Sequence, residues 1–229
     1  MSSAAPDFDA ATAWVRATLD RDLPSHLAYH TAAHTTDDVV PAAIRLADAE
    51  ALSGRDRLIL LTAAWFHDVG YTVRTTGHEA VSIEFADREL PALGYGPEDV
   101  AAVTDLIRAT QMPQRPESHL AGLLADADLD VLGRPDFLES NGRLRRELAA
   151  LGRVYGDADW YDEQIAFVAA HRYHTSTARA MRDETKARNL DRLRELRSAA
   201  QPFRVLRRRF GIRRRTDGRS TLRGAPNEI

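Results

Sequence analysis

Apolar residues recur along this chain at intervals of three and four positions, and alternating runs of β-branched residues are almost absent. This pattern predicts a succession of amphipathic α-helices joined by short loops, with no β-strand. The expected helices cover about 7–19, 35–52, 56–67, 78–94, 97–110 and 119–133, and two or three more lie between 135 and 198. We therefore predict an all-α fold, a helical bundle of about eight or nine helices.

Two of these segments depart from the common amphipathic pattern. Residues 56–67 (DRLILLTAAWFH) are apolar on nearly every side, which is typical of a helix buried in the centre of a bundle. Pro41 falls inside the 35–52 segment, where it either kinks the helix or marks its true first turn. Aromatic side chains at helical spacings are expected in the core and not on a stacking platform: Trp14, Trp65, Tyr155, Trp160 and Phe167.

Composition favours one compact domain and narrows the possible chemistry. The chain has 229 residues, of which 44% are hydrophobic and 28% charged, the balance of an ordinary globular protein. There is no cysteine, so disulfides, cysteine-based zinc sites and thiol nucleophiles are excluded. Any metal must be bound by histidine and carboxylate side chains.

The charge is unevenly distributed. Residues 202–229 contain nine arginines against Asp217 and Glu228, although the whole chain has a formal net charge of -3. We interpret residues 1–200 as a single domain and 202–229 as a basic, flexible tail, the alternative being contact with RNA or anionic lipid. The N-terminus lacks a signal-peptide pattern and no stretch is long and apolar enough for a membrane span, so a cytoplasmic protein without a membrane partner is expected.

The candidate chemistry lies in His and Asp residues at the ends of predicted helices: His34, His67, Asp68 and Asp128. Imidazole and carboxylate ligands together suit divalent Mn, Fe, Co, Ni, Mg or Zn. Neighbours on a regular helix diverge by about 100°, so His67 and Asp68 can meet one ion only where the helix ends. Val69 and Gly70 supply such an ending.

Four motifs, in this order, resemble the HD superfamily of metal-dependent phosphohydrolases: YHTAAHTTDDVV, AAWFHDVGY, HEAVSIEFA and LLADADLDVLG. The resemblance spans 29–133, and QIAFVAAHRYHT…KARNL extends it to about Leu190, within the C-terminal helices at 135–198. It implies an HD-domain helical bundle. It also implies hydrolysis of a phosphoester bond by metal-activated water, on a nucleotide or a related small phosphorylated metabolite.

The resemblance also implies roles for individual residues. His34, His67, Asp68 and Asp128 correspond to the metal ligands, and Asp68 also orients or deprotonates the water. A similar YHN..H arrangement in the cyclic-nucleotide phosphodiesterase branch makes His30 the general acid; its alternative is a buried histidine bonded to backbone. Asp126 and Asp128 point to different sides of a helix. The family's ADxL-like context selects Asp128 as the ligand and leaves Asp126 a supporting or structural carboxylate.

Three further sets of residues have competing interpretations. His78 and Glu79, with Ser82, resemble an HE..S element that assists catalysis or holds a second ion, but Glu79 also suits a helix N-terminus. His119 falls where dinuclear relatives place an extra ligand, yet its surroundings predict an exposed loop. Four basic residues of the late helices either bind a substrate phosphate or form a solvated face: His171, Arg172, His174 and Lys186.

Two other functions compete with hydrolysis. An HD-fold di-iron oxygenase would need additional histidine ligands, for which His78 and His119 are the candidates. A non-catalytic metal- or nucleotide-binding regulatory protein would keep the site and act on a partner. The residues alone identify neither the substrate, the ion, nor the oligomeric state. A small phosphorylated molecule is the expected partner and nucleic acid is not.

Overall fold

A computed structural model describes residues 5–200 of the chain, and within these residues the fold is entirely helical. The helices are α1 (Phe8–Asp22), α2 (Val40–Ala49), α3 (Gly54–Phe66), α4 (His78–Glu89), α5 (Pro97–Ala109), α6 (His119–Asp128), α7 (Phe137–Ala150), α8 (Asp157–Ala170) and α9 (Ser176–Ala199). Four short segments join them: a π-helical turn η1 (His34–Val39), and the 3₁₀ turns η2 (Val69–Thr72), η3 (Leu90–Leu93) and η4 (Asp130–Gly133). The prediction of an all-α bundle is confirmed.

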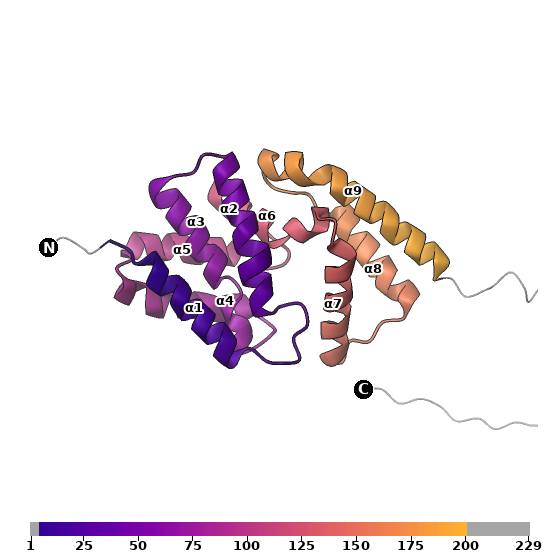
Figure 1. Ribbon diagram of the computed structural model, residues 1–229, viewed down its shortest axis with the longest axis horizontal. Coiled ribbons are helices and arrows are strands. Elements are labelled where there is room, and N and C mark those ends of the chain that lie inside the picture. Colours follow the sequence, from indigo (N-terminus) through magenta and orange to yellow (C-terminus); the bar gives the residue numbers. More distant parts are fainter. Residues whose placement is uncertain (1–4, 201–229) are drawn as a thin grey trace, which may run out of the picture.

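The helices form two lobes (Figure 1). Helices α1 to α6 make the larger lobe, and α7, α8 and α9 pack beside one another at its flank, joined to it through η4. Each lobe has its own apolar core: one surrounds Phe66 and Ile107, and the other surrounds Phe137, Val168 and Leu193. The arrangement therefore leaves a seam between the lobes.

Helix α3 occupies the centre of the larger lobe, as its apolar sequence predicted. It packs against α1, α2, α5 and α6, and its side chains from Ile59 to Phe66 are almost all buried. A helix in this position must be apolar on every side, because each side faces another helix. Its C-terminal end therefore lies inside the protein.

Several predicted boundaries were wrong for local reasons. The predicted 35–52 helix begins with the π-helical turn η1, and the regular helix starts at Val40, so Pro41 marks a first turn and not a mid-helix kink. Helix α1 continues to Asp22. The predicted 119–133 helix ends at Asp128, where the 3₁₀ turn η4 follows. This early ending leaves Asp128 free to turn away from the helix surface.

The predicted core aromatics divide into two groups. Trp65 and Trp160 are buried, and Trp14 packs partly buried against the larger core. Tyr155 is only half-buried, so it does not belong to the core, whereas Phe167 packs against the smaller core and also lines a cavity. Phe167 therefore contributes both to the core of the smaller lobe and to the cavity wall.

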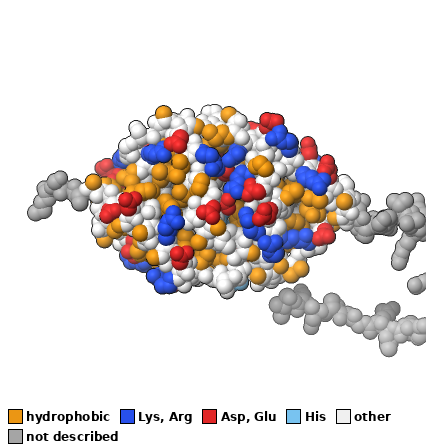
Figure 2. Space-filling model, in the orientation of Figure 1, with side chains coloured by type: hydrophobic (Ala, Val, Ile, Leu, Met, Phe, Trp, Pro, Cys, Tyr) orange, Lys and Arg blue, Asp and Glu red, His pale blue; other side chains and the backbone are white. Residues whose placement is uncertain are grey.

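The visible surface carries no large region of a single charge (Figure 2). Acidic and basic side chains are interspersed there, with hydrophobic side chains between them. Among the described residues, no helix has the length and apolar character needed to cross a bilayer. The predicted basic tail at 202–229 lies outside the described residues.

Candidate metal centre

The ends of three elements deliver the predicted ligands to one buried point. His34 is the first residue of η1, His67 and Asp68 follow the last residue of α3, and Asp128 is the last residue of α6. The helical turn changes at each of these places. At the end of α3 the backbone passes from α-helix to the 3₁₀ turn η2, which lets the adjacent His67 and Asp68 face the same point.

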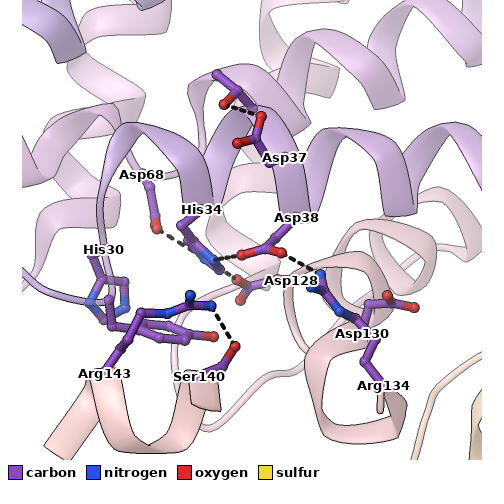
Figure 3. A network of polar contacts seen from close by, with 12 residues as sticks. His30, His34, Asp37, Asp38, Asp68, Asp128, Asp130, Arg134, Ser140 and Arg143 are labelled. Atoms are coloured by element: carbon purple, nitrogen blue, oxygen red, sulfur yellow. Dashed lines mark hydrogen bonds and ion pairs between the residues drawn. The ribbon is translucent and has the colours of Figure 1, made fainter. Parts of the chain in front are cut away.

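The four side chains converge closely, and three of them, His34, Asp68 and Asp128, are seen together in Figure 3. The Nε2 atom of His34 lies 3.5 Å from Asp68 Oδ2 and 3.6 Å from Asp128 Oδ1. The Nε2 atom of His67 lies 3.3 Å and 3.6 Å from the same two oxygens. Two nitrogens and two oxygens thus surround a common centre. Four ligands about 2.1 Å from one ion are separated by roughly 3.4 Å, which matches this spacing.

The donor atoms lack the partners that buried polar groups normally have. His67 Nε2 and Asp68 Oδ2 are buried and make no hydrogen bond within the described chain. The Nδ1 atom of His67 lies 2.9 Å from the carbonyl oxygen of Ala64, to which it donates, so the Nε2 lone pair faces the centre. A nitrogen lone pair and carboxylate oxygens that face one another are ligands for a cation placed between them. The residues therefore fit a divalent metal ion.

The same demand for positive charge is visible in the pKa of His34. Burial opposes protonation of the ring, but Asp128, Asp38 and Asp68 outweigh it and raise its pKa to about 10. The Nδ1 atom of His34 lies 3.8 Å from Asp38, which is ion-paired with Arg134. Arg134 and Asp38 thus support the ring from behind (Figure 3). We did not predict Asp38, although its position four residues after His34 was a signal.

His30 lies beside the centre and is held by a residue of the other lobe. Its Nδ1 atom is 2.5 Å from Glu147 Oε1, and Glu147 Oε2 accepts hydrogen bonds from the backbone N–H groups of Tyr29 and His30, at 2.8 and 2.9 Å. Glu147 is buried in the last turn of α7. Burial raises the pKa of Glu147, but the His30 ring and these two N–H groups outweigh that effect and lower it. No sequence pattern singled out Glu147.

His78 reaches the centre from the first turn of α4. Its Nε2 atom lies 3.1 Å from Asp68 Oδ1, and its Nδ1 atom is 3.6 Å from Glu79. Burial alone would lower the pKa of His78, but Asp68 outweighs it and raises the pKa. The Tyr71 ring is stacked between His78 and His30, with centroid distances of 3.9 and 4.2 Å. Tyr71, which sequence reasoning did not single out, therefore fixes the planes of both imidazoles.

Ser82 and Asp126 have structural partners away from the centre. Ser82 is buried and accepts a hydrogen bond from the backbone N–H of Gly70, which holds the loop after Asp68 against α4. Asp126 accepts hydrogen bonds from His174 N at 2.7 Å, and from Thr175 N and Oγ1 at 2.8 and 2.7 Å. Asp126 thereby anchors the start of α9.

The remaining basic candidates lie elsewhere. His119 is exposed and paired with Glu50, so it does not approach the centre. Lys186 donates to the carbonyl oxygen of His171 at 2.7 Å, and its Nζ atom lies 3.2 Å from the Nδ1 atom of the His171 ring. Burial and, to a smaller extent, the positive charge of Lys186 lower the pKa of His171 to about 4. His174 contacts Gln114, and Arg172 is exposed.

For the four late basic residues, the sequence left phosphate binding and a solvated helix face as alternatives. None of them lines the cavity at the centre: His171, Arg172, His174 and Lys186. Lys186 is turned inward and donates to the backbone carbonyl of His171.

A cavity of about 400 Å³ opens at the centre and runs along the seam between the lobes. One end is lined by the polar side chains His30, Asp68, His78, Glu79 and Asp128. The other end is lined mainly by apolar side chains of η4, α7 and α8, among them Leu132, Phe137, Leu144, Leu148 and Phe167. This size lies within the range of roughly 300–1,000 Å³ that is typical of small-molecule sites.

The architecture defines a class: an all-α fold with a buried His–Asp cluster at the end of its central helix, compatible with a divalent ion. Comparison with solved structures agrees. Bacillus subtilis YpgQ, solved in complex with ADP, has a TM-score of 0.60 and 23% identity over 84% of this chain and 94% of its own. A protein from an uncultured Thermotogales bacterium, described as a predicted HD superfamily hydrolase, has a TM-score of 0.54 and 23% identity over 85% and 93%.

The chain therefore has the HD-domain fold, as the order of its motifs predicted. At 23% identity the two likenesses concern the fold. No protein-family profile matches the chain, and no curated protein matches it.

Proposed function

We propose that this protein is a metal-dependent hydrolase of phosphoester bonds that acts on a small phosphorylated molecule. His34, His67, Asp68 and Asp128 would hold the divalent ion. The observation that carries the proposal is the convergence of two imidazole nitrogens and two carboxylate oxygens, 3.3–3.6 Å apart, where the cavity begins. Buried donors without partners at the mouth of a ligand-sized cavity are the arrangement of a catalytic metal site.

A bound divalent ion supplies two effects here, a lowered pKa of a coordinated water and polarisation of a phosphoryl oxygen. The chain supplies the proton chemistry. Cleavage of a phosphoester leaves an alkoxide or phosphate oxygen that must gain a proton. His30 lines the cavity beside the centre, and its Nδ1 side is held by Glu147, so its Nε2 side is directed away from α7. We assign His30 as the general acid.

His78 and Glu79 act on the other side of Asp68. The 3.1 Å contact between His78 Nε2 and Asp68 Oδ1 holds the carboxylate in one orientation, leaving its Oδ2 atom toward the centre. Asp68 can then orient the attacking water while also serving as a ligand. Glu79 lines the same end of the cavity and supports His78 through its Nδ1 side. Each such proton-handling group typically contributes about 10²–10⁴-fold to a rate.

Two observations support a nucleotide or a similar small phosphorylated metabolite as the substrate. YpgQ, which shares the fold, was solved with ADP. The cavity has a polar end that suits a phosphate next to a cation and an apolar end that suits an organic group. A sugar phosphate lacks the apolar part that would fill the second end.

Activity of the purified protein tests the proposal. The wild type is incubated with nucleotides, cyclic nucleotides and simple phosphoesters in the presence of Mn, Mg, Co, Ni, Zn or Fe, beside Asp68→Ala and a control, Asp37→Ala. Asp37 is exposed, bonded to Thr36, and only three residues from His34. We expect metal-dependent cleavage in the wild type and in Asp37→Ala, and none in Asp68→Ala. Full activity of Asp68→Ala would contradict the assignment.

A further inference from the structure

The apolar end of the cavity contains a polar group that the proposed hydrolysis does not use. Leu144 and Leu148 project from α7, and Phe167 projects from α8; all three are half-buried and line the cavity. The side chain of Gln164 is buried and lines the same cavity. Ser140, Asn141, Arg153 and Glu163 line the same cavity, and a few polar groups among apolar walls are what orient a ligand in such sites.

A chain of hydrogen bonds determines which way this amide points. The indole Nε1 atom of Trp160 donates to Asn141 Oδ1 at 2.8 Å, and Asn141 Nδ2 donates to Gln164 Oε1 at 2.5 Å. An indole N–H can only donate, so the Asn141 atom facing it must be the oxygen. The amide nitrogen of Asn141 is then the donor to Gln164, and the Gln164 atom that receives this bond must be its oxygen.

In this orientation, the Gln164 amide nitrogen is left without a hydrogen-bond partner within the described part of the chain. Its oxygen is engaged, and its Nε2 atom makes no hydrogen bond with any described residue. Trp160 and Asn141 are both buried, so the relay is shielded from competing water. The Gln164 amide therefore presents a donor, and not an acceptor, to whatever occupies the apolar end.

We propose that Gln164 determines substrate specificity, by donating a hydrogen bond to an acceptor atom on the edge of a flat, apolar ring. The proposal rests on the proposed function for the phosphate end of the cavity. The fitting ligands are phosphoesters whose organic group carries a ring nitrogen or carbonyl oxygen. A ring without an acceptor leaves a buried donor unpaired, and a hydroxyl-rich group leaves its own polar atoms against Leu144, Leu148 and Phe167.

Matched ligands that differ only in acceptor atoms test the proposal in the wild-type protein. Two pairs of riboside 5′-monophosphates are compared. The first pair carries a purine or an indole ring, and the second carries a pyrimidin-2-one or a phenyl ring. The first member of each pair has only acceptors on its ring, and the second has neither acceptor nor donor. Dissociation constants are measured by calorimetry. We expect the acceptor ring of at least one pair to bind tighter, on the order of 5- to 100-fold.

Substitutions in the relay supply the decisive comparison. Gln164→Met keeps the length and removes the donor, so the preference should fall to about one. Asn141→Asp still accepts from Trp160 but cannot donate, so the Gln164 amide must turn and place its oxygen toward the ring. The preference should then fall to one or reverse, although Asn141→Asp leaves Gln164 itself unchanged. Glu163→Gln, a neighbouring change of charge on the cavity rim, is the control and should keep the preference.

Ribose 5-phosphate, which has the same phosphate and sugar but no ring, serves as the reference probe. It should bind the wild type and Gln164→Met alike, and in Asn141→Asp and Glu163→Gln it measures the effect of the changed charge, by which the ring ligands are corrected; circular dichroism confirms that each variant is folded. If Asn141→Asp does not fold, the Gln164→Met comparison stands alone. A wild-type preference near one for both pairs would overturn the proposal, as would a preference that persists unchanged in Gln164→Met.

The same samples separate this proposal from the proposed hydrolysis. Release of inorganic phosphate from each monophosphate is followed with the divalent ion that gives the highest rate. An acceptor preference in binding without turnover would refute the hydrolase and keep the role of Gln164. Turnover without an acceptor preference would keep the hydrolase and refute the role of Gln164.

Discussion

Asp126 and Asp128, two positions apart on α6, contact entirely different partners. Asp128 faces the Nε2 atoms of His34 and His67, whereas Asp126 accepts three hydrogen bonds at the start of α9. Burial raises the pKa of Asp126 in spite of those bonds. A spacing of two residues places the two carboxylates on different sides of the helix, and the same substitution should therefore have different consequences at each.

The first prediction uses this pair. Asp128→Asn should reduce the affinity for Mn by at least about 10-fold, because one anionic ligand is lost, and should leave the free energy of unfolding nearly unchanged. Asp126→Asn should keep the affinity and lower the free energy of unfolding by about 1–3 kcal/mol, because its hydrogen bonds to Thr175 are weakened. Calorimetric titration and urea unfolding measure the two quantities. Equal loss of Mn affinity in both variants would contradict the division of roles.

Residue identity predicted some contacts of the centre and missed others. His34, His67 and Asp68 stand in motifs whose order is specific, so their proximity could be expected from the sequence alone. The contact of Glu147 with His30 could not be expected from the sequence, because the two residues are 117 positions apart and the helix of Glu147 shows only an ordinary amphipathic pattern. Which side chain meets His30 depends on how the two lobes pack, and local periodicity carries no information about that.

At the scale of elements, the site depends on irregular helix ends. The π-helical turn η1 precedes α2, and the 3₁₀ turn η2 follows α3. Such irregular turns are frequent at functional sites. The sequence predicted the regular helices well, since these follow from apolar spacing. It did not predict η1, because no residue type in HTTDDV distinguishes a π-helical turn from an α-helical one.

A glycine determines how closely η2 approaches α4. A Cβ atom at Gly70 would lie 2.0 Å from the carbonyl oxygen of His78, so Gly70→Ala requires movement of the backbone. We expect a loss of about 3 kcal/mol or more in the free energy of unfolding, together with a disturbed contact between His78 and Asp68. Urea unfolding of the variant measures the loss.

Gly142 supplies the matched control. It lies inside α7, and its nearest neighbour would be the flexible end of Arg146, at 4.0 Å. Gly142→Ala should therefore stabilise the protein by about 0.5–1 kcal/mol, because alanine loses less backbone entropy than glycine in a helix. A similar, small effect at both glycines would show that the close packing of η2 on α4 is not required.

At the scale of the whole molecule, partly buried polar contacts join the two lobes. Glu147 of α7 binds the backbone and ring of His30, Arg134 pairs with Asp38, and Asp130 of η4 accepts from Arg45 of α2 and Arg182 of α9. The lobes have separate apolar cores, so these contacts and the cavity walls determine how they sit together.

The contact of Glu147 should make stability depend on pH in a defined direction. Its pKa in the folded protein is below the ordinary 4.5, so its contribution is complete above about pH 4.5 and is lost as the pH falls through the folded value. Glu147→Gln should lower the free energy of unfolding by about 1–3 kcal/mol at pH 7. The difference from the wild type should shrink toward pH 3.5.

Urea unfolding at the two pH values measures this difference. Glu139→Gln is the control, because Glu139 is exposed on the same helix and pairs only with Arg143 among the described residues. A difference for Glu147→Gln that is as large at pH 3.5 as at pH 7 would exclude the ionised contact as its source.

The division of the site between two lobes has a consequence for the order of synthesis. All four proposed metal ligands have been translated once the chain reaches Asp128, whereas the partner of His30 comes later, at Glu147. Gln164 follows later still. A nascent chain would thus carry the groups that bind an ion before those that hold the proton donor or choose the substrate. Hydrolytic competence would arrive last, when the second lobe closes the seam.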